Sequence, residues 1–194
     1  VCSSDLLALS GSIATGGAVL AAQAMGADFA YMGTRFIATY IENRLKFSAY
    51  IKDAAVIGQG RDMLVAIVCV DFQAVGQWAQ EHGVAYTSYA ELSQQPRIYD
   101  LIRGEIAAVN AHLPHGLSID RFVNLHKEFD PDDGEVTRTR KLKRNVIDDR
   151  YGPIIEALNR GDDQIDFKAK ITYENGQTGS LDRVLRLSDV KGAA

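Results

Sequence analysis

The chain has 194 residues, with 21 Lys and Arg against 25 Asp and Glu, which gives a formal net charge of -4 at pH 7. Apolar residues make up 46% and charged residues 24%, a composition typical of globular domains and not of disordered chains. The negative charge argues against nucleic acid or an anionic membrane as the main partner, and two cysteines are too few for a disulfide framework.

The character of the sequence changes near Thr39. Residues 1–39 hold three charges and are rich in Gly and Ala, whereas charged and aromatic residues are frequent from Tyr40 onward. The uncharged span 6–27 is long enough to cross a bilayer. Its Gly, Ser and Thr content and the acidic Asp5 before it instead favour a strand and a helix outside a membrane. We therefore predict no transmembrane segment.

Helix and strand patterns follow one another along the first half of the chain. Residues 18–25 favour a helix that ends at Gly26, and "ADFAYMG" favours a short strand. We then predict a helix over 41–47, strands at "AAVIG" and "MLVAIVCVDF" around the turn "QGRD", and a helix over 72–82. Because "MLVAIVCVDF" is apolar almost throughout, we expect it to lie inside a sheet.

The second half gives three clear predictions. Residues 98–113 form an amphipathic pattern stopped by Pro114, and "RFVNLH" reads as a strand. Residues 142–158 favour a helix that the Gly152–Pro153 pair kinks or divides. The stretch "DFKAKITYENGQTGSLDRVLRL" alternates around Asn175–Gly176, which predicts a β-hairpin.

Residues 11–39 read "GSIATGGAVLAAQAMGADFAYMGTRFIAT". This stretch resembles the last two βα units of the nitronate monooxygenase family, which are flavin-dependent TIM barrels. Gly33 and Thr34 match a turn that holds the flavin phosphate in that family, whereas Gly11, Ser12 and Ile13 replace its usual glycine pair. A barrel cannot close on two strands, so we expect a remnant that binds no flavin.

A longer resemblance covers residues 40–191. It is carried by "YIENRLKFSAYIKDAAVIGQGRDMLVAIVCVDFQAVGQWA", "AYTSYAELSQQPRIYDLI", "LHKEFDPDDGEVTRTRKLKRNVI" and "RYGPIIEAL". These stretches resemble the C-terminal lid domain of bacterial AMP-forming long-chain fatty-acid–CoA ligases. The resemblance implies an α+β fold with a small mixed sheet and flanking helices, plus a terminal β-hairpin and an N-terminal βα fragment. It also implies a large N-terminal adenylation domain as partner, which holds ATP, Mg²⁺ and the fatty acid, with CoA as the second substrate.

The two resemblances divide the chain into four predicted segments. These are a non-native scar at 1–10, a partial flavin-barrel βα fragment at 11–39, a lid domain at 40–160 and a β-hairpin appendage at 161–194. The hinge motif that the ligase resemblance implies before Tyr40 is absent, and "VCSSDL" resembles a translated sequencing adaptor. We therefore expect a chimeric reading frame, with a real gene fusion as the alternative.

The strongest local signal is "TRTRKLKR" at residues 137–144, in which five of the seven residues from Arg138 are basic. The preceding "KEFDPDDGE" carries five acids, so spacing alone predicts a solvated charged loop leading into a helix. In the resembled ligases a lysine of this motif enters the active site for adenylation, and matching the motif places it at Lys141. Its ammonium would stabilise the charge that builds up as a carboxylate attacks the α-phosphate of ATP.

The other residues of this motif are expected to support the loop or to lie at contacts. We expect Thr137 and Thr139 to shape the loop through hydroxyl hydrogen bonds. The remaining basic residues are expected at the surface or at domain contacts: Arg138, Arg140, Lys143 and Arg144. The motif departs from the Ser-Gly-Lys form of many acyl-activating enzymes but fits the long-chain branch.

The histidines and Cys69 are weak candidates for chemistry. His112 and His115 are separated by Pro114 and have no evident Cys or carboxylate partner, so we expect no metal site. His126 follows an apolar strand and is expected to be a satisfied edge residue. Cys69 is expected to behave as a small buried hydrophobe.

The sequence thus predicts the C-terminal portion of an ATP-dependent long-chain fatty-acid–CoA ligase. The parent would activate a fatty acid as an acyl-adenylate and then form a thioester with CoA, and the chain alone would be inactive. The alternatives are a non-catalytic α+β fragment or docking module and, with less support, a remnant of an FMN-dependent nitronate monooxygenase. The predicted location is the cytoplasm, with peripheral contact to the inner membrane as an option for the parent.

Overall fold

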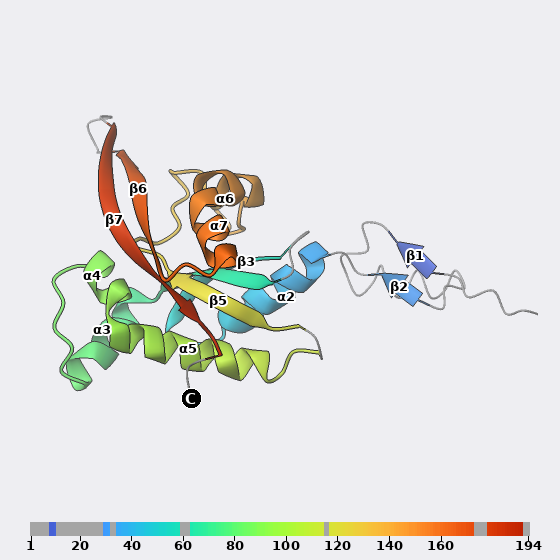
Figure 1. The fold of residues 1–194 in the computed structure, drawn as a ribbon, viewed down its shortest axis with the longest axis horizontal. Coiled ribbons are helices and arrows are strands. Elements are labelled where there is room, and N and C mark those ends of the chain that lie inside the picture. Colours follow the sequence, from blue (N-terminus) through green and yellow to red (C-terminus); the bar gives the residue numbers. More distant parts are fainter. Residues whose placement is uncertain are drawn as a thin grey trace, which may run out of the picture.

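A computed structural model describes residues 8–10, 29–31, 34–58, 63–114, 117–172 and 178–191. Five strands form one mixed sheet in the order β3-β4-β5-β7-β6 (Figure 1). These strands are β3 (Ile51–Ile57), β4 (Leu64–Val70), β5 (Ile119–Asn124), β6 (Gln164–Thr172) and β7 (Thr178–Asp189). The described helices are α2 (Thr34–Leu45), α3 (Phe72–Glu81), α4 (Tyr89–Gln94), α5 (Pro96–Asn110), α6 (Arg144–Arg150) and α7 (Gly152–Arg160). The α+β class with a small mixed sheet and flanking helices is therefore confirmed.

Helices cover both faces of the sheet. Even-numbered residues of β3 and β4, such as Val56 and Val68, pack in one core with residues of α2, α3 and α5. Odd-numbered residues, such as Ile67 and Cys69, pack in a second core with α6 and α7. A strand buried on both faces reads as a continuous apolar run, which explains the sequence of β4. Its predicted interior place is confirmed, because β4 pairs antiparallel with β3 and parallel with β5.

The helix predicted over 142–158 is two helices. Tyr151 ends α6, and α7 starts at Gly152 with a proline in its first turn. The proline ring removes one backbone donor and fixes φ, so it suits a helix start better than a helix interior. The division expected at Gly152–Pro153 is thus confirmed.

The predicted hairpin forms, but it does more than append to the domain. Strands β6 and β7 pair antiparallel, and β7 also pairs with β5 through Arg121, Phe122 and Val123. The guanidinium of buried Arg121 forms an ion pair with Asp189 of β7 and donates hydrogen bonds to carbonyls next to α7, at 3.1 Å from Leu158 O and 2.9 Å from Asp162 O. The hairpin is consequently part of the main sheet. The turn at Asn175–Gly176 lies outside the described residues.

The N-terminal part contributes one two-stranded parallel pair, β1 (Ala8–Ser10) with β2 (Phe29–Tyr31). This pair lies apart from the five-stranded sheet, beyond the start of α2 (Figure 1). The predicted strand "ADFAYMG" is confirmed at its centre, whereas the helix over 18–25 falls outside the described residues. Helix α2 starts at Thr34 and runs through the predicted boundary between Thr39 and Tyr40 without a break.

Candidate functional site

The motif around Lys141 forms a tight loop between β5 and α6. An isolated bridge between Val136 and Leu142 closes it. Within the bridge, the Thr137 N–H donates to Lys141 O at 2.8 Å, and the Arg140 N–H donates to Thr137 O at 2.8 Å. Lys141 itself is an exposed residue of this loop.

Threonine hydroxyls fix the inside of this loop, as predicted. The Lys141 N–H donates to Thr137 Oγ1 at 3.0 Å, and the hydroxyls of Thr137 and Thr139 lie 3.0 Å apart within hydrogen-bond distance. Such short-range hydroxyl bonds give the backbone a fixed alternative to a helix or strand ladder. They therefore hold the backbone of Lys141 in place without using its side chain.

The four remaining basic residues of the motif do not behave alike. Arg138 and Lys143 are exposed, as predicted. Arg140 is also exposed, as predicted, but its guanidinium lies 2.5 Å from a carboxylate oxygen of Asp53, a residue 2% exposed on β3. This hydrogen bond raises the pKa of Arg140 above its ordinary value. A buried carboxylate requires a partner, which is the physical reason for this ion pair.

Arg144, in contrast, is half-buried rather than at the surface. Its guanidinium lies 2.7 Å from a carboxylate oxygen of Glu42 on α2 and 3.2 Å from Val56 O on β3. The N–H of Val56 donates in turn to Glu42 at 2.8 Å. Burial raises the pKa of Glu42, although Val56 and Arg144 act in the opposite direction. Arg144 thus joins the start of α6 to α2 and β3.

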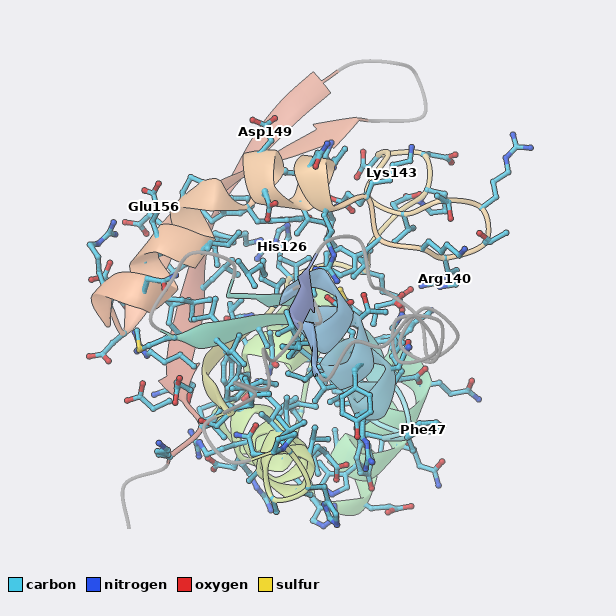
Figure 2. All side chains as sticks on the ribbon, turned by 90° about the vertical axis from the view of Figure 1, so that its right-hand side faces the viewer. Phe47, His126, Arg140, Lys143, Asp149 and Glu156 are labelled. Atoms are coloured by element: carbon cyan, nitrogen blue, oxygen red, sulfur yellow. The ribbon has the colours of Figure 1, made fainter. Side chains whose placement is uncertain are left out.

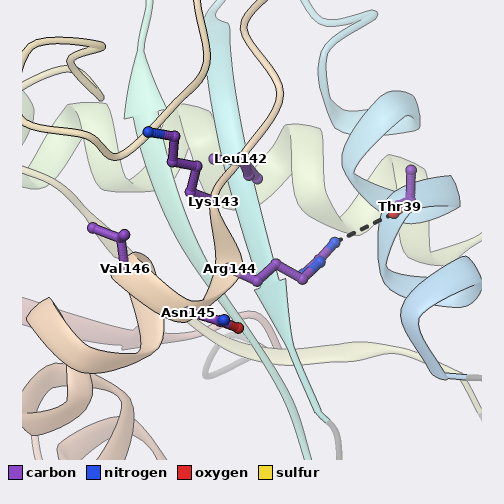
Figure 3. Close-up of a pocket in the computed structure, with 6 residues that line it drawn as sticks. All are labelled: Thr39, Leu142, Lys143, Arg144, Asn145 and Val146. Carbon is purple, nitrogen blue, oxygen red and sulfur yellow. Dashed lines mark hydrogen bonds between the residues drawn. The ribbon is translucent and has the colours of Figure 1, made fainter.

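A hollow of about 540 Å³ lies beside this junction and is lined by Thr39, Leu142, Lys143, Arg144, Asn145 and Val146. Figure 3 shows Arg144 reaching across to Thr39, whose hydroxyl lies 3.3 Å from the guanidinium, while Lys143 extends the other way. The hollow therefore combines one anchored arginine with one exposed lysine.

The acidic segment before the motif is not a wholly solvated loop. Glu135 is fully buried and is the centre of a network. Its carboxylate accepts from Lys127 Nζ at 2.9 Å, Arg150 Nη1 at 2.7 Å, Tyr151 Oη at 2.5 Å and the Asp130 N–H at 3.0 Å. Burial acts to raise the pKa of Glu135, but the hydrogen bonds from Tyr151, Asp130 and Lys127 outweigh it and lower that pKa. The network ties the segment to α6 and α7.

His126 lies in a second hollow, of about 630 Å³, between α4 and β7. It is only 8% exposed, and its Nδ1 has no hydrogen-bond partner among the described residues, so the prediction of a satisfied edge residue was wrong. Burial, with Lys127 and Arg183 nearby, lowers the pKa of His126 to about 4. The ring packs against Phe167 of β6. The local sequence did not indicate that β6 belongs to the main sheet.

Among the described residues, the other candidates have no partners that indicate chemistry. Cys69 is a buried free thiol, as expected of a small hydrophobe. His112 is exposed and contacts Ala108 O through Nδ1 at 2.8 Å, whereas His115 lies outside the described residues. Within the described ranges, no three His, Cys, Asp or Glu side chains gather as a metal site would require. None of the helices described there is long and apolar enough to cross a membrane.

The flavin-type turn is only partly visible. Gly33 lies outside the described residues, and Thr34 is the first residue of α2. The comparisons with known proteins do not support the resemblance of residues 11–39 to nitronate monooxygenases.

Those comparisons instead point to one class of enzyme. No family model matches the chain. Over about 60% of its length, however, the chain is similar to fatty-acid–CoA ligases.

Two of these relatives illustrate the match. The long-chain-fatty-acid–CoA ligase FadD15 of Mycobacterium tuberculosis is 29% identical over 119 residues, which cover 61% of this chain and 20% of that protein. The putative fatty-acid–CoA ligase fadD11 of the same species is 34% identical over 102 residues, covering 53% and 18%. The chain thus spans about a fifth of the length of the curated relatives that it matches.

Solved structures give a weaker similarity. The adenylation domain of a carboxylic acid reductase from Segniliparus rugosus, in complex with AMP and a co-purified carboxylic acid, has a TM-score of 0.49 and 16% identity over 64% of this chain and 18% of its own. The adenylation domain of a carboxylate reductase from Mycobacterium chelonae has a TM-score of 0.48 and 23% identity over 62% and 17%.

Proposed function

We propose that this chain supplies the C-terminal lid of an AMP-forming long-chain fatty-acid–CoA ligase, in which Lys141 is the catalytic residue. The observation that carries the proposal is an exposed lysine on an anchored loop, in a chain similar to fatty-acid–CoA ligases over 61% of its length. An exposed ammonium on a fixed backbone suits a group that acts on a substrate held by another domain.

The proposed reaction has two steps. A fatty-acid carboxylate oxygen attacks the α-phosphorus of ATP, the bond to the bridging oxygen breaks, and pyrophosphate leaves with that electron pair. The CoA thiolate then attacks the acyl carbonyl, and AMP leaves. In the first step two anions approach each other, so a lysine ammonium placed between them stabilises the transition state more than the ground state.

The other participants are assigned to the rest of the parent enzyme. We propose that a large adenylation domain binds ATP and the fatty acid and holds Mg²⁺, which neutralises phosphate charge when bound. The described residues offer no cluster of three acidic, His or Cys ligands for that ion. Of the proposed segments, 40–160 is the lid and 161–194 extends its sheet, while 1–10 and 11–39 come from a chimeric reading frame. The proposed location is the cytoplasm.

A hybrid enzyme tests this function. Residues 34–191, which keep α2 whole, replace the part of M. tuberculosis FadD15 that this chain matches. With ATP, Mg²⁺, palmitate and CoA, the hybrid should release AMP, whereas the 194-residue chain alone should release none above the blank. A folded hybrid without activity, or sustained AMP release by the chain alone, would contradict the proposal.

Within the hybrid, Lys141→Ala should slow acyl-adenylate formation by about 10²–10³, or ~3 kcal/mol or more, as expected when one preorganised charge is lost. Thioester formation from supplied acyl-adenylate should suffer much less, because the lid is proposed to rotate and remove the lysine in that step. Lys143→Ala is the matched control, because it removes the same charge from an exposed position two residues away. Equal defects in both steps, or a larger defect for Lys143, would refute the assignment of Lys141.

A further inference from the structure

Arg140 has an unusual backbone. Its φ is 56°, in the left-handed region that residues with a side chain rarely adopt, and it is the one non-glycine residue with positive φ among those described. A strained residue persists only where the surrounding structure holds it there. The position directly before Lys141 therefore needs a contact that keeps an arginine in place of a glycine.

That contact is with Asp53. The guanidinium of Arg140 lies 2.5 Å from Asp53 Oδ2, and Lys46 Nζ lies 3.0 Å from Asp53 Oδ1. Asp53 is 2% exposed and lies on β3, at the point where its pairing with β4 shifts register. A buried carboxylate on a sheet strand moves little, so it provides a fixed point 87 residues away in sequence from the loop that it holds.

We propose that Arg140 and Asp53 form a tether that positions the backbone of Lys141. The pull of Asp53 holds Arg140 in the left-handed conformation, and this conformation sets the direction of the next residue. Arg140 lies on the loop at one margin of the molecule, on the same side as Lys143 (Figure 2). The tether leaves Lys141 exposed while the loop stays attached to β3. The catalytic part of this inference depends on the proposed function, but the tether itself does not.

Hydrogen exchange of the Lys141 amide, measured by NMR in the 194-residue chain, tests the tether directly. This N–H donates to Thr137 Oγ1, so its exchange rate reports loop order. Arg140→Ala and Asp53→Asn should each raise the rate about tenfold, and the double variant should add nothing further. Arg140→Lys should restore part of the protection. The Val68 amide on β4 monitors the sheet and should keep its protection in Arg140→Ala.

Two controls sharpen the result. Arg138→Ala removes an exposed arginine from the same loop and should leave the Lys141 rate unchanged. Arg140→Gly relieves the strained φ while it removes the side chain, so it should still lose protection. Unchanged exchange in Arg140→Ala, or full protection in Arg140→Gly, would overturn the tether.

The hybrid enzyme tests the positioning role. Arg140→Ala should lower kcat for acyl-adenylate formation about tenfold with little change in the KM for ATP, and Arg140→Lys should recover part of kcat. A loss in KM alone, or an unchanged kcat, would overturn the positioning role. An inactive parent hybrid would refute the proposed function, while the exchange result would still stand as the test of the tether.

Discussion

At the scale of single residues, buried polar groups decide how the candidate site is built. Glu135 accepts hydrogen bonds from four donors. Asp53 forms ion pairs with Lys46 and Arg140, and Glu42 forms one with Arg144. Replacing one partner of such a group leaves the other buried without compensation, which is more costly than losing a surface ion pair. The loop that carries Lys141 is therefore held in place by ion pairs with buried carboxylates, although its sequence reads as a simple basic run.

His126 should make the stability of the chain sensitive to mild acid. Its pKa is lowered to about 4 in the folded protein, so the unfolded chain binds a proton first as the pH falls below about 6.5. Stability is then lost progressively from pH 6.5 to 4, by up to about 3 kcal/mol. Urea unfolding of the wild type and of His126→Gln across this range measures the effect.

Comparing the wild type with His126→Gln isolates the contribution of His126 to the pH dependence of stability. Glu135, with its lowered pKa, loses its contribution only below its ordinary range near 4.5, and Glu42, with its raised pKa, acts in the opposite direction. Both are present in wild type and variant. The slope of stability against pH between 6.5 and 5 should therefore be smaller in His126→Gln, and equal slopes would contradict the effect of burial.

At the scale of elements, local patterns predict the helices and strands but not their distant partners. The apolar run of β4, the break at Gly152–Pro153 and the alternation of β6 and β7 each depend on neighbouring residues, and each was confirmed. The pairing of β7 with β5 was not predictable in this way, because nothing near β7 in sequence indicates which edge it joins.

The candidate site shows the same limit. The position of Lys141 and the hydroxyl bonds of Thr137 follow from a motif eight residues long. The partner of Arg140 is 87 residues away, and that of Arg144 is 102 residues away. Ion pairs of this kind depend on which strand and helix the fold brings together. Residue type alone therefore does not indicate the buried carboxylate that each arginine contacts.

Two helix glycines, Gly104 and Gly161, should respond in opposite ways to replacement by alanine. An added Cβ at Gly104, within α5, meets no atom of the described residues within 4 Å, so Gly104→Ala should stabilise the chain by ~1 kcal/mol through helix propensity. Gly161 ends α7 with φ of 88°, and Gly161→Ala should destabilise the chain by about 1 kcal/mol because that conformation disfavours a side chain. Urea midpoints at an unchanged m-value measure both changes. If both substitutions shifted the urea midpoint in the same direction, one of these two predictions would be refuted.

At the scale of the whole molecule, α2 sets where the folded unit starts. Ala38 is buried in the core, and Ile37 packs against it. The hydroxyl of Thr39 lies within hydrogen-bond distance of Arg144. These contacts fall on the N-terminal side of the boundary predicted at Tyr40, although the composition of the chain changes there. The change in composition near Thr39 therefore does not coincide with the limit of the packed unit.

Two truncations should separate these boundaries. Removing residues 1–33 should leave the Tm nearly unchanged, because the β1–β2 pair lies apart from the main sheet. Removing residues 1–39 also deletes the first turns of α2, and should cost about 2 kcal/mol or ~4–8 °C. Thermal unfolding followed by circular dichroism gives both values. Equal Tm values for the two truncations would place the boundary at Tyr40 after all.

The place of β7 between β5 and β6 has a consequence for synthesis on the ribosome. Strands β3, β4 and β5 are complete once Asn124 has been made, but the strand that covers the free edge of β5 ends only at Asp189. At a synthesis rate of roughly 5–20 residues per second, that edge stays unpaired for about 3–13 seconds. An unpaired edge of buried, apolar strands is a template for other chains. Newly made chains should therefore be most prone to aggregate during this interval, and slower translation of residues 125–189 should lower the soluble yield.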